Sequence, residues 1–182
     1  MDRKEPHSLI ANTMRLQIAT RFIHLEGRTH LIKSSCSLSH KTVLKLSKEL
    51  TGRAPRTGKT AISYLWAVKT PENNIEASAF YAIFKKMYDA HFAMQAAYEQ
   101  KHHVSYETIM FVESFEFLVR IQKNHEMDIN RAATILQAVQ KGDLVQIDCR
   151  YCTRKFLSNL SSADFREKCP VCHFSKKQKR IG

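Results

Sequence analysis

The sequence predicts a mainly α-helical protein with a helix-turn-helix-like N-terminal part and a small C-terminal lobe built around four cysteines. Apolar residues recur at helical spacing through most of the chain, a short turn joins two of the expected helices, and four cysteines form two close pairs near the end. With 182 residues, 43% of them hydrophobic, the chain can form one ordinary core and a small appendage. We expect a helical domain over residues 1–143 and a metal-binding lobe with a basic tail over 144–182.

The N-terminal helices are expected between residues 8 and 52. Residues 8–25 place leucine and isoleucine at heptad spacing, which predicts a buried helix ending near Gly27. A short helix over "RTHLIKSS" follows, then a break at "CSLS" and a helix over "HKTVLKLSKEL". Ser39 suits the N-cap of that last helix and Gly52 suits its end. Helix, short turn and helix is the arrangement of many DNA-binding units.

Three longer helices are expected in the middle of the chain. Pro71 in the first turn starts a helix over "ENNIEASAFYAIFKKMYDAHFAMQAAYEQ". The next helix, "YETIMFVESFEFLVRIQ", follows a Ser105 cap and is apolar on more than one side, which predicts deep burial or a protein interface. The third, within "DINRAATILQAVQKGDL", ends near Gly142.

The charge of the chain favours a polyanionic partner. Its 29 Lys and Arg residues exceed its 17 Asp and Glu residues, which leaves a formal net charge of +12. An excess of this size favours DNA, RNA or an anionic surface. The N-terminus has no apolar stretch of signal-peptide length, and no uncharged apolar run approaches the ~20 residues that cross a bilayer. We therefore expect a cytoplasmic protein that does not contact a membrane.

The positive charge is organised on the helix "HKTVLKLSKEL". Three lysines fall within about 60° of one another at 100° per residue: Lys41, Lys45 and Lys48. Apolar residues occupy the opposite side: Val43, Leu46 and Leu50. An ordinary amphipathic surface helix has the same pattern. The stripe is more informative because it runs directly into a second basic segment.

That second segment is the loop "TGRAPRTGKT", residues 51–60. It resembles a phosphate-binding loop, but five residues instead of four separate its first glycine from Gly-Lys-Thr, and Pro55 removes an amide donor. The segment before the loop also reads as a helix where a strand is required. We therefore expect its basic side chains to contact the phosphate backbone of DNA: Arg53, Arg56 and Lys59.

The cysteines carry the strongest local signal. "CRYC" and "CPVC" are two CxxC pairs separated by sixteen residues, and together they supply four thiolates: Cys149, Cys152, Cys169 and Cys172. This spacing predicts one structural zinc ion per chain with a closed coordination shell. Two disulfides or a redox CxxC are weaker alternatives in a reducing compartment, and an iron–sulfur cluster stays open because it uses the same ligands. Basic residues crowd this lobe and predict a second contact with nucleic acid. No catalytic constellation stands out, so we expect no enzyme.

From about Met14 to Cys172 the chain resembles the FlhC family, a subunit of the bacterial flagellar transcriptional master activator. The resemblance is carried by "FIHLEGRTHLIKSSCSLSHKTVLKLSKELTG", "RAPRTGK", "EASAFYAIF" and the four-cysteine segment, in that order. It implies a mainly helical fold with a C-terminal zinc lobe. The family's zinc ligands carry over to the four cysteines of the CxxC pairs.

The resemblance also implies a function. It implies a transcriptional activator that binds double-stranded DNA upstream of flagellar or related operons. It implies assembly with FlhD-type chains, as a hetero-hexamer, and contact with RNA polymerase. From another class, the residues leave open a zinc-stabilised assembly or adaptor protein whose basic surface meets RNA or an acidic protein partner. A defined DNA footprint would select the activator.

Overall fold

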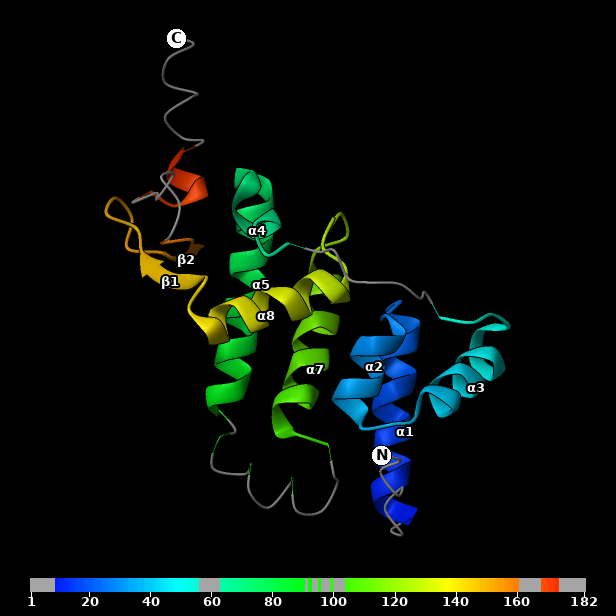
Figure 1. Ribbon diagram of the computed structural model, residues 1–182. Helices are drawn as coiled ribbons and strands as arrows, with labels where there is room; N and C mark the ends of the chain where they lie inside the picture. Colours follow the sequence, from blue (N-terminus) through cyan, green and yellow to red (C-terminus); the bar gives the residue numbers. More distant parts are fainter. Residues whose placement is uncertain are drawn as a thin grey trace. The chain divides into compact units, whose positions relative to one another are not determined.

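A computed structural model of the chain describes residues 9–55, 63–90, 92, 95, 99, 104–160 and 168–173. In these residues the protein is mainly α-helical, which confirms the predicted fold class (Figure 1). The helices are α1 (Leu9–His24), α2 (Thr29–Cys36), α3 (His40–Thr51), α4 (Trp66–Lys69), α5 (Pro71–Ala90), α7 (Tyr106–Ile121) and α8 (Ile129–Lys141). Two strands, β1 (Val145–Asp148) and β2 (Lys155–Ser158), form an antiparallel hairpin.

Most of the predicted helix starts and ends agree closely with these bounds, but the helix predicted over residues 72–100 corresponds to α5, which ends at Ala90. The Ser39 hydroxyl accepts a hydrogen bond from the Thr42 amide at the start of α3, and Ser105 caps α7 in the same way. Gly52 ends α3 with a φ of 72°. Two further features differ from the expectation: the sequence pattern did not predict the short helix α4 or the two strands. The tail and most of the segment after α5 lie outside the described residues.

The chain divides into two compact units, which we describe separately. The first comprises residues 1–60, 84–117 and 128–130, and the second comprises residues 61–83, 118–127 and 131–182. Long helices contribute to both, because α5 and α7 each begin in one unit and end in the other. The boundary that we predicted between residues 143 and 144 stays a prediction.

In the first unit α1, α2 and α3 pack against one another (Figure 1). Helix α1 ends at His24; beyond it Glu26 lies in the left-handed region, at a φ of 58°, and the Gly27 amide donates to the Phe22 carbonyl over 2.8 Å. A Cβ atom on Gly27 would come within 2.9 Å of that carbonyl oxygen, so only glycine fits this turn. The turn redirects the chain into α2.

Helix α7 completes the core of the first unit. The rings of Phe22 and Phe111 lie 5.8 Å apart, and both are buried. At the edge of this contact the Arg21 guanidinium donates two hydrogen bonds, of 2.9 and 2.8 Å, to the Glu116 carboxylate. Two parallel hydrogen bonds fix the orientation of the guanidinium relative to the carboxylate as well as the distance between them. They therefore set how α1 lies along α7.

In the second unit α5 holds the outer edge of β2. The Leu157 amide donates to the Ser78 hydroxyl over 2.9 Å, and the Leu157 carbonyl accepts from the Asn74 amide group over 2.8 Å. Asn74 and Ser78 are buried and one helical turn apart, so they face the same strand residue. Asn74 also donates to the Ala67 carbonyl of α4. Two side chains thus satisfy main-chain groups that β1 does not reach.

A buried carboxylate orders the connection between α7 and α8 in the same unit. Glu76 on α5 is 4% exposed, and its oxygens accept from the Glu126 and Met127 amides over 3.0 and 3.2 Å. Burial raises the pKa of Glu76, while the amide of Glu126 lowers it. The carboxylate thus supplies the hydrogen-bond acceptors for two successive main-chain amides of a segment that has no regular secondary structure.

We expect Ser78→Ala to destabilise the protein by about 1–3 kcal/mol, because it leaves the buried Leu157 amide without an acceptor. Urea unfolding followed by circular dichroism measures the change. Ser34→Ala is the matched control, since the Ser34 hydroxyl is exposed and bonds only within its own helix. Equal midpoints for the two variants would contradict the assigned role of Ser78.

Candidate metal centre and nucleic-acid interface

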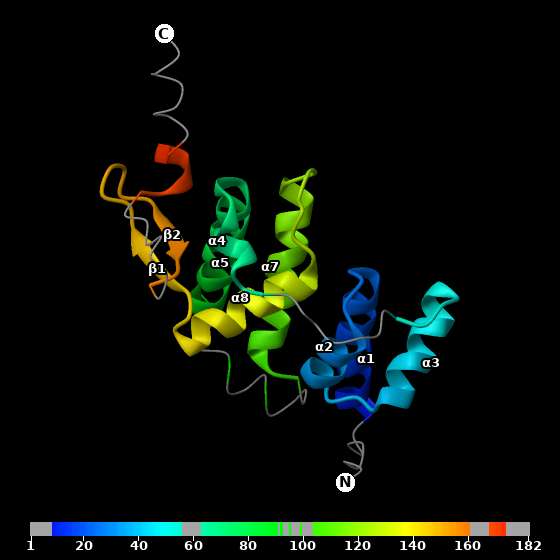
Figure 2. The same ribbon diagram turned by 45° about the horizontal axis from the view of Figure 1, so that its top comes forward.

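The hairpin of the second unit positions the first cysteine pair. Strands β1 and β2 pair in register from Val145 opposite Ser158 to Asp148 opposite Lys155, and the CxxC pair forms the turn between them (Figure 2). The Cys149 amide donates to the Arg154 carbonyl and the Thr153 amide to the Cys149 carbonyl. The tight turn requires a φ of 58° at Thr153. Both thiols therefore leave the same end of the hairpin.

The second pair comes from a helical turn at residues 170–173. Cys169 precedes that turn and Cys172 lies within it. The structure brings the four sulfur atoms together, all within 4.8 Å of one another. Cys149, Cys169 and Phe156 form a small buried cluster, against which the remaining cysteines pack. The two CxxC pairs thus meet in space although sixteen residues separate them in the sequence.

The spacing of the sulfur atoms fits a tetrahedral ion. Zinc–sulfur bonds of about 2.3 Å imply sulfur–sulfur edges of about 3.8 Å. The Sγ atoms of Cys152 and Cys169 lie 3.5 Å apart, and the largest separation in the group is 4.8 Å. These separations are close to the edge length of such a tetrahedron. These four residues can hold a metal ion, and the all-thiolate donor set suits zinc or iron.

Main-chain amides donate to the Cys149 sulfur and favour its thiolate form. Burial acts to raise the pKa of Cys149, but amides that include those of Cys169 and Tyr151 donate to its sulfur over 3.3 and 3.4 Å and bring the pKa down to about 6. Hydrogen bonding to the Cys152 thiol and burial raise the pKa of Cys172 to about 12. An ion entering this site would displace protons from the remaining thiols.

The fifth cysteine belongs to a different environment. Cys36 is fully buried in the first unit, and burial raises the pKa of its thiol to about 12. A thiol held neutral in this way is a poor nucleophile and a poor metal ligand. Cys36 is therefore a core residue of the helix-turn-helix part.

The predicted basic stripe lies on the solvent side of α3. Lys41, Lys45 and Lys48 are all exposed, while Val43 is fully buried against the first unit. The apolar side differs from the expectation in one respect, because Leu50 is 39% exposed. Ser47, which the pattern did not single out, is 1% exposed, and its hydroxyl donates to the Arg53 carbonyl. The buried side of α3 is therefore formed by Val43 and Ser47, and it does not extend to Leu50 as the apolar pattern had indicated.

A left-handed residue forms the turn between α2 and α3. Ser37 has a φ of 50°, Leu38 is buried, and Ser39 caps the next helix. The sequence pattern missed Arg15, which stabilises this turn from α1. Arg15 is 3% exposed, and its Nε donates to the Cys36 carbonyl at the C-terminus of α2 over 2.7 Å. A cation at a helix C-terminus is favourable, and only the tertiary fold reveals it.

The basic loop begins at the end of α3. Arg53 is exposed, with an 80% exposed side chain 3.9 Å from the Glu26 carboxylate. Its carbonyl accepts from the hydroxyls of Ser47 and Thr51, so its backbone is tied to α3. The other two predicted contacts, Arg56 and Lys59, lie outside the described residues. The described part of the loop thus adds one exposed cation close to the C-terminal end of α3.

Comparison with known proteins identifies the family. A family model described as "Flagellar transcriptional activator (FlhC)" matches residues 4–181, almost the whole chain. The chain belongs to the FlhC family. It is 26% identical over 171 residues to the flagellar transcriptional regulator FlhC of Gallionella capsiferriformans, covering 91% of this chain and 87% of that relative. The FlhC protein of Paraburkholderia atlantica is 27% identical over 169 residues, 91% of this chain and 72% of the relative.

A shorter match has higher identity. The FlhC protein of Enterobacter cloacae is 36% identical over 77 residues, 42% of this chain and 40% of the relative. Membership in the FlhC family supports transcriptional regulation as the function of this chain at the level of its class. Within the described residues, no helix has both the length and the apolar character that a membrane span requires.

We expect about one metal ion per chain and its loss in Cys149→Ser, with unfolding of the hairpin, because structural zinc contributes ~10 kcal/mol or more to such small lobes. Elemental analysis of reduced protein by mass spectrometry measures the ion. Cys36→Ala is the control and should keep the ion. Soluble wild-type protein with neither zinc nor iron would contradict the site, and iron in place of zinc would overturn the zinc assignment alone.

Proposed function

We propose that this chain is the DNA-binding subunit of a transcription activator that acts with FlhD-type chains at flagellar or related operons. The observation that carries the proposal is the exposed basic side of α3, which follows a tight turn after α2 and continues into Arg53. The family supplies the transcriptional role, and the geometry of α1–α3 supports a means of contact with DNA.

The arrangement of α2 and α3 supports separate tasks for the two basic segments. In helix-turn-helix proteins the second helix enters the major groove and its N-terminal residues reach base edges. We assign this position to α3, with Lys41 nearest the start of the helix and Lys45 and Lys48 further along the same side. Lys45 lies 3.8 Å from the Glu49 carboxylate, both exposed, so its charge is partly balanced. The loop side chains Arg53, Arg56 and Lys59 would contact phosphates and so fix the position of the protein along the duplex.

We assign a structural zinc ion to Cys149, Cys152, Cys169 and Cys172. Four thiolate ligands would fill the coordination shell and leave no position for a substrate or for an activated water. The ion would supply folding free energy to the C-terminal lobe. The proposed function therefore requires no catalytic step from the metal centre, and we propose that the chain is not an enzyme.

Assembly with FlhD-type chains, as a hetero-hexamer, is part of the proposal. The sequence predicted deep burial or a protein interface for α7, and the chain itself buries most of its apolar side chains, including Phe111 and Phe115. Phe117 remains 46% exposed on α7, and Leu9 and Ile10 of α1 are 84% and 62% exposed. Exposed apolar side chains of this size support a protein contact. Contact with RNA polymerase and a cytoplasmic location, where the DNA lies, complete the proposal.

We expect the complex of this chain with an FlhD-type chain from the same genome to give a defined footprint on duplex DNA upstream of its operons. Arg53→Ala should weaken operator and random DNA alike and lower the slope of log affinity against log salt by about one, because one phosphate contact is lost. Lys41→Ala, if it reads a base, should cost roughly 1–3 kcal/mol on the operator alone. Fluorescence anisotropy across a salt titration measures both effects.

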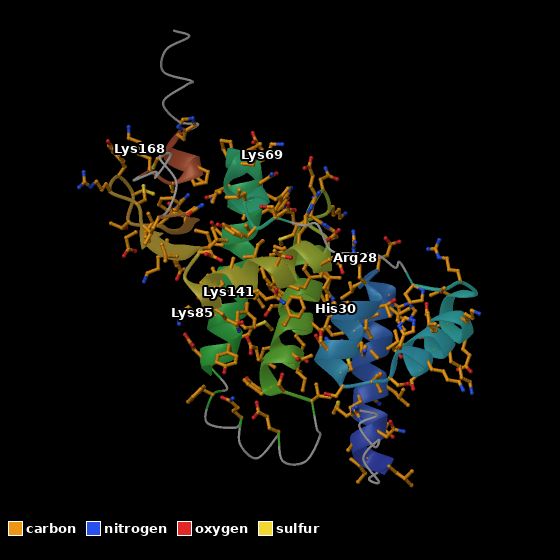
Figure 3. All side chains as sticks on the ribbon, viewed as in Figure 1. Arg28, His30, Lys69, Lys85, Lys141 and Lys168 are labelled. Carbon is orange, nitrogen blue, oxygen red and sulfur yellow. The ribbon has the colours of Figure 1, made fainter. Side chains whose placement is uncertain are left out.

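Lys85→Ala is the matched control for these substitutions. Lys85 is exposed on α5 (Figure 3). Its ammonium lies 2.8 Å from the Asp89 carboxylate one turn away. Its removal should leave DNA affinity and salt slope unchanged. A complex that binds any polyanion without a footprint, or protein only, would replace this proposal with a zinc-stabilised adaptor that meets RNA or an acidic protein.

A further inference from the structure

A second basic surface lies beside the cysteine cluster of the second unit. Tyr151 stands at the tip of the first CxxC turn and is 56% exposed. The Lys168 ammonium lies 4.6 Å from the centroid of the Tyr151 ring. Lys168 directly precedes Cys169, so the start of the second cysteine pair meets the tip of the first. Figure 3 shows Lys168 beside the hairpin.

Two arginines flank this pair. Arg150 precedes Tyr151 in the turn, Arg154 ends it, and both are exposed. Lys155 is also exposed, but Asp148 stands opposite it in the strand register, so we leave Lys155 out of the surface. We use the name knuckle surface for Arg150, Tyr151, Arg154 and Lys168. Among the described residues 149–160 and 168–173 there is no Asp or Glu.

We propose that the knuckle surface is a second DNA contact, one that binds the sugar–phosphate backbone of the duplex. This inference rests on the proposed function, because it presupposes that the assembled complex binds DNA. It adds a place of contact in a different unit from α3, and it names the residues that make the contact. The role assigned to them is positioning on the backbone, with no reading of bases.

Charge and chemistry favour a phosphate backbone as the occupant. Arginine, lysine and the tyrosine hydroxyl are among the side chains that bind phosphate oxygens in protein–DNA complexes. The three cations exceed the charge of about −2 that zinc with four thiolates would carry. Cys149 and Cys169 are each 2% exposed, so part of the thiolate charge lies deeper than the cationic groups. One aromatic ring among cations is too small an apolar area for a stable protein interface.

The knuckle surface lies on a hairpin whose position is restricted by other contacts of the second unit. Its edge is held through Leu157 by Asn74 and Ser78 of α5, and the cysteine cluster holds its tip. The cation–π contact with Lys168 restricts the Tyr151 ring before any ligand arrives. A surface held at both ends loses little conformational entropy when it binds, so each phosphate contact contributes most of its free energy to affinity.

The test uses the complete complex with its FlhD-type partner and three variants: Lys168→Gln, Arg154→Gln and Tyr151→Leu. We expect Lys168→Gln and Arg154→Gln each to lower the salt slope by about 0.9 and to weaken operator and random duplex alike. Tyr151→Leu should weaken binding without a change in slope, because it removes no charge. Lys141→Gln, an exposed lysine at the end of α8 in the same unit, is the control and should match wild type.

Metal content measured on every variant keeps the test interpretable. A variant that retains its ion but binds DNA with wild-type affinity and slope overturns the inference and leaves the proposed function intact. If the wild-type complex binds no duplex DNA, the proposed function fails and the inference fails with it. Loss of binding to the partner chain, with DNA affinity kept, would assign the knuckle surface to protein contact and also overturn the inference.

Discussion

Two side chains on α5 bind the main chain of one strand residue, and the β hairpin of the second unit depends on that contact. Asn74 and Ser78 bind the carbonyl and the amide of Leu157, a residue only 1% exposed. Buried main-chain groups without partners would destabilise the fold, so the hairpin requires the helix. The first CxxC pair forms the tip of this hairpin. The geometry of the four sulfur atoms therefore depends on α5 as well as on any ion they bind.

Local signals were readable from the sequence. Ser39 and Ser105 predict helix starts because their hydroxyls cap helices, and Gly52 predicts a helix end because glycine accepts a positive φ. The spacing of the paired cysteines alone predicts that they form one cluster. Arg15 and Ser78 could not be found in this way, because each acts on a main-chain group 21 or 79 residues distant. The strands were missed because each has only four residues, β1 just before the first CxxC pair and β2 just after it, which is too few to display a period of two.

The distribution of charge gives the two units complementary tasks in the proposed activator. The first presents the basic side of α3, placed by a turn that Arg15 stabilises through the Cys36 carbonyl. The second presents the knuckle surface on a lobe in which four cysteine sulfur atoms lie close enough to share a metal ion. Sequence-independent contacts with phosphates add affinity that falls steeply with salt, while base contacts by α3 would add discrimination. In this proposal the subunit would contact DNA at two places and would read sequence at one of them.

The cysteine cluster and α5 should therefore unfold together as one cooperative structure. Hydrogen exchange of the reduced protein, followed by mass spectrometry with and without a metal chelator, tests this expectation most directly. The account predicts that chelation raises exchange in residues 145–158 and in residues 71–83 together, because Leu157 connects them. Faster exchange confined to residues 145–173, with residues 71–83 as protected as before, would contradict the account and would favour an independent C-terminal lobe.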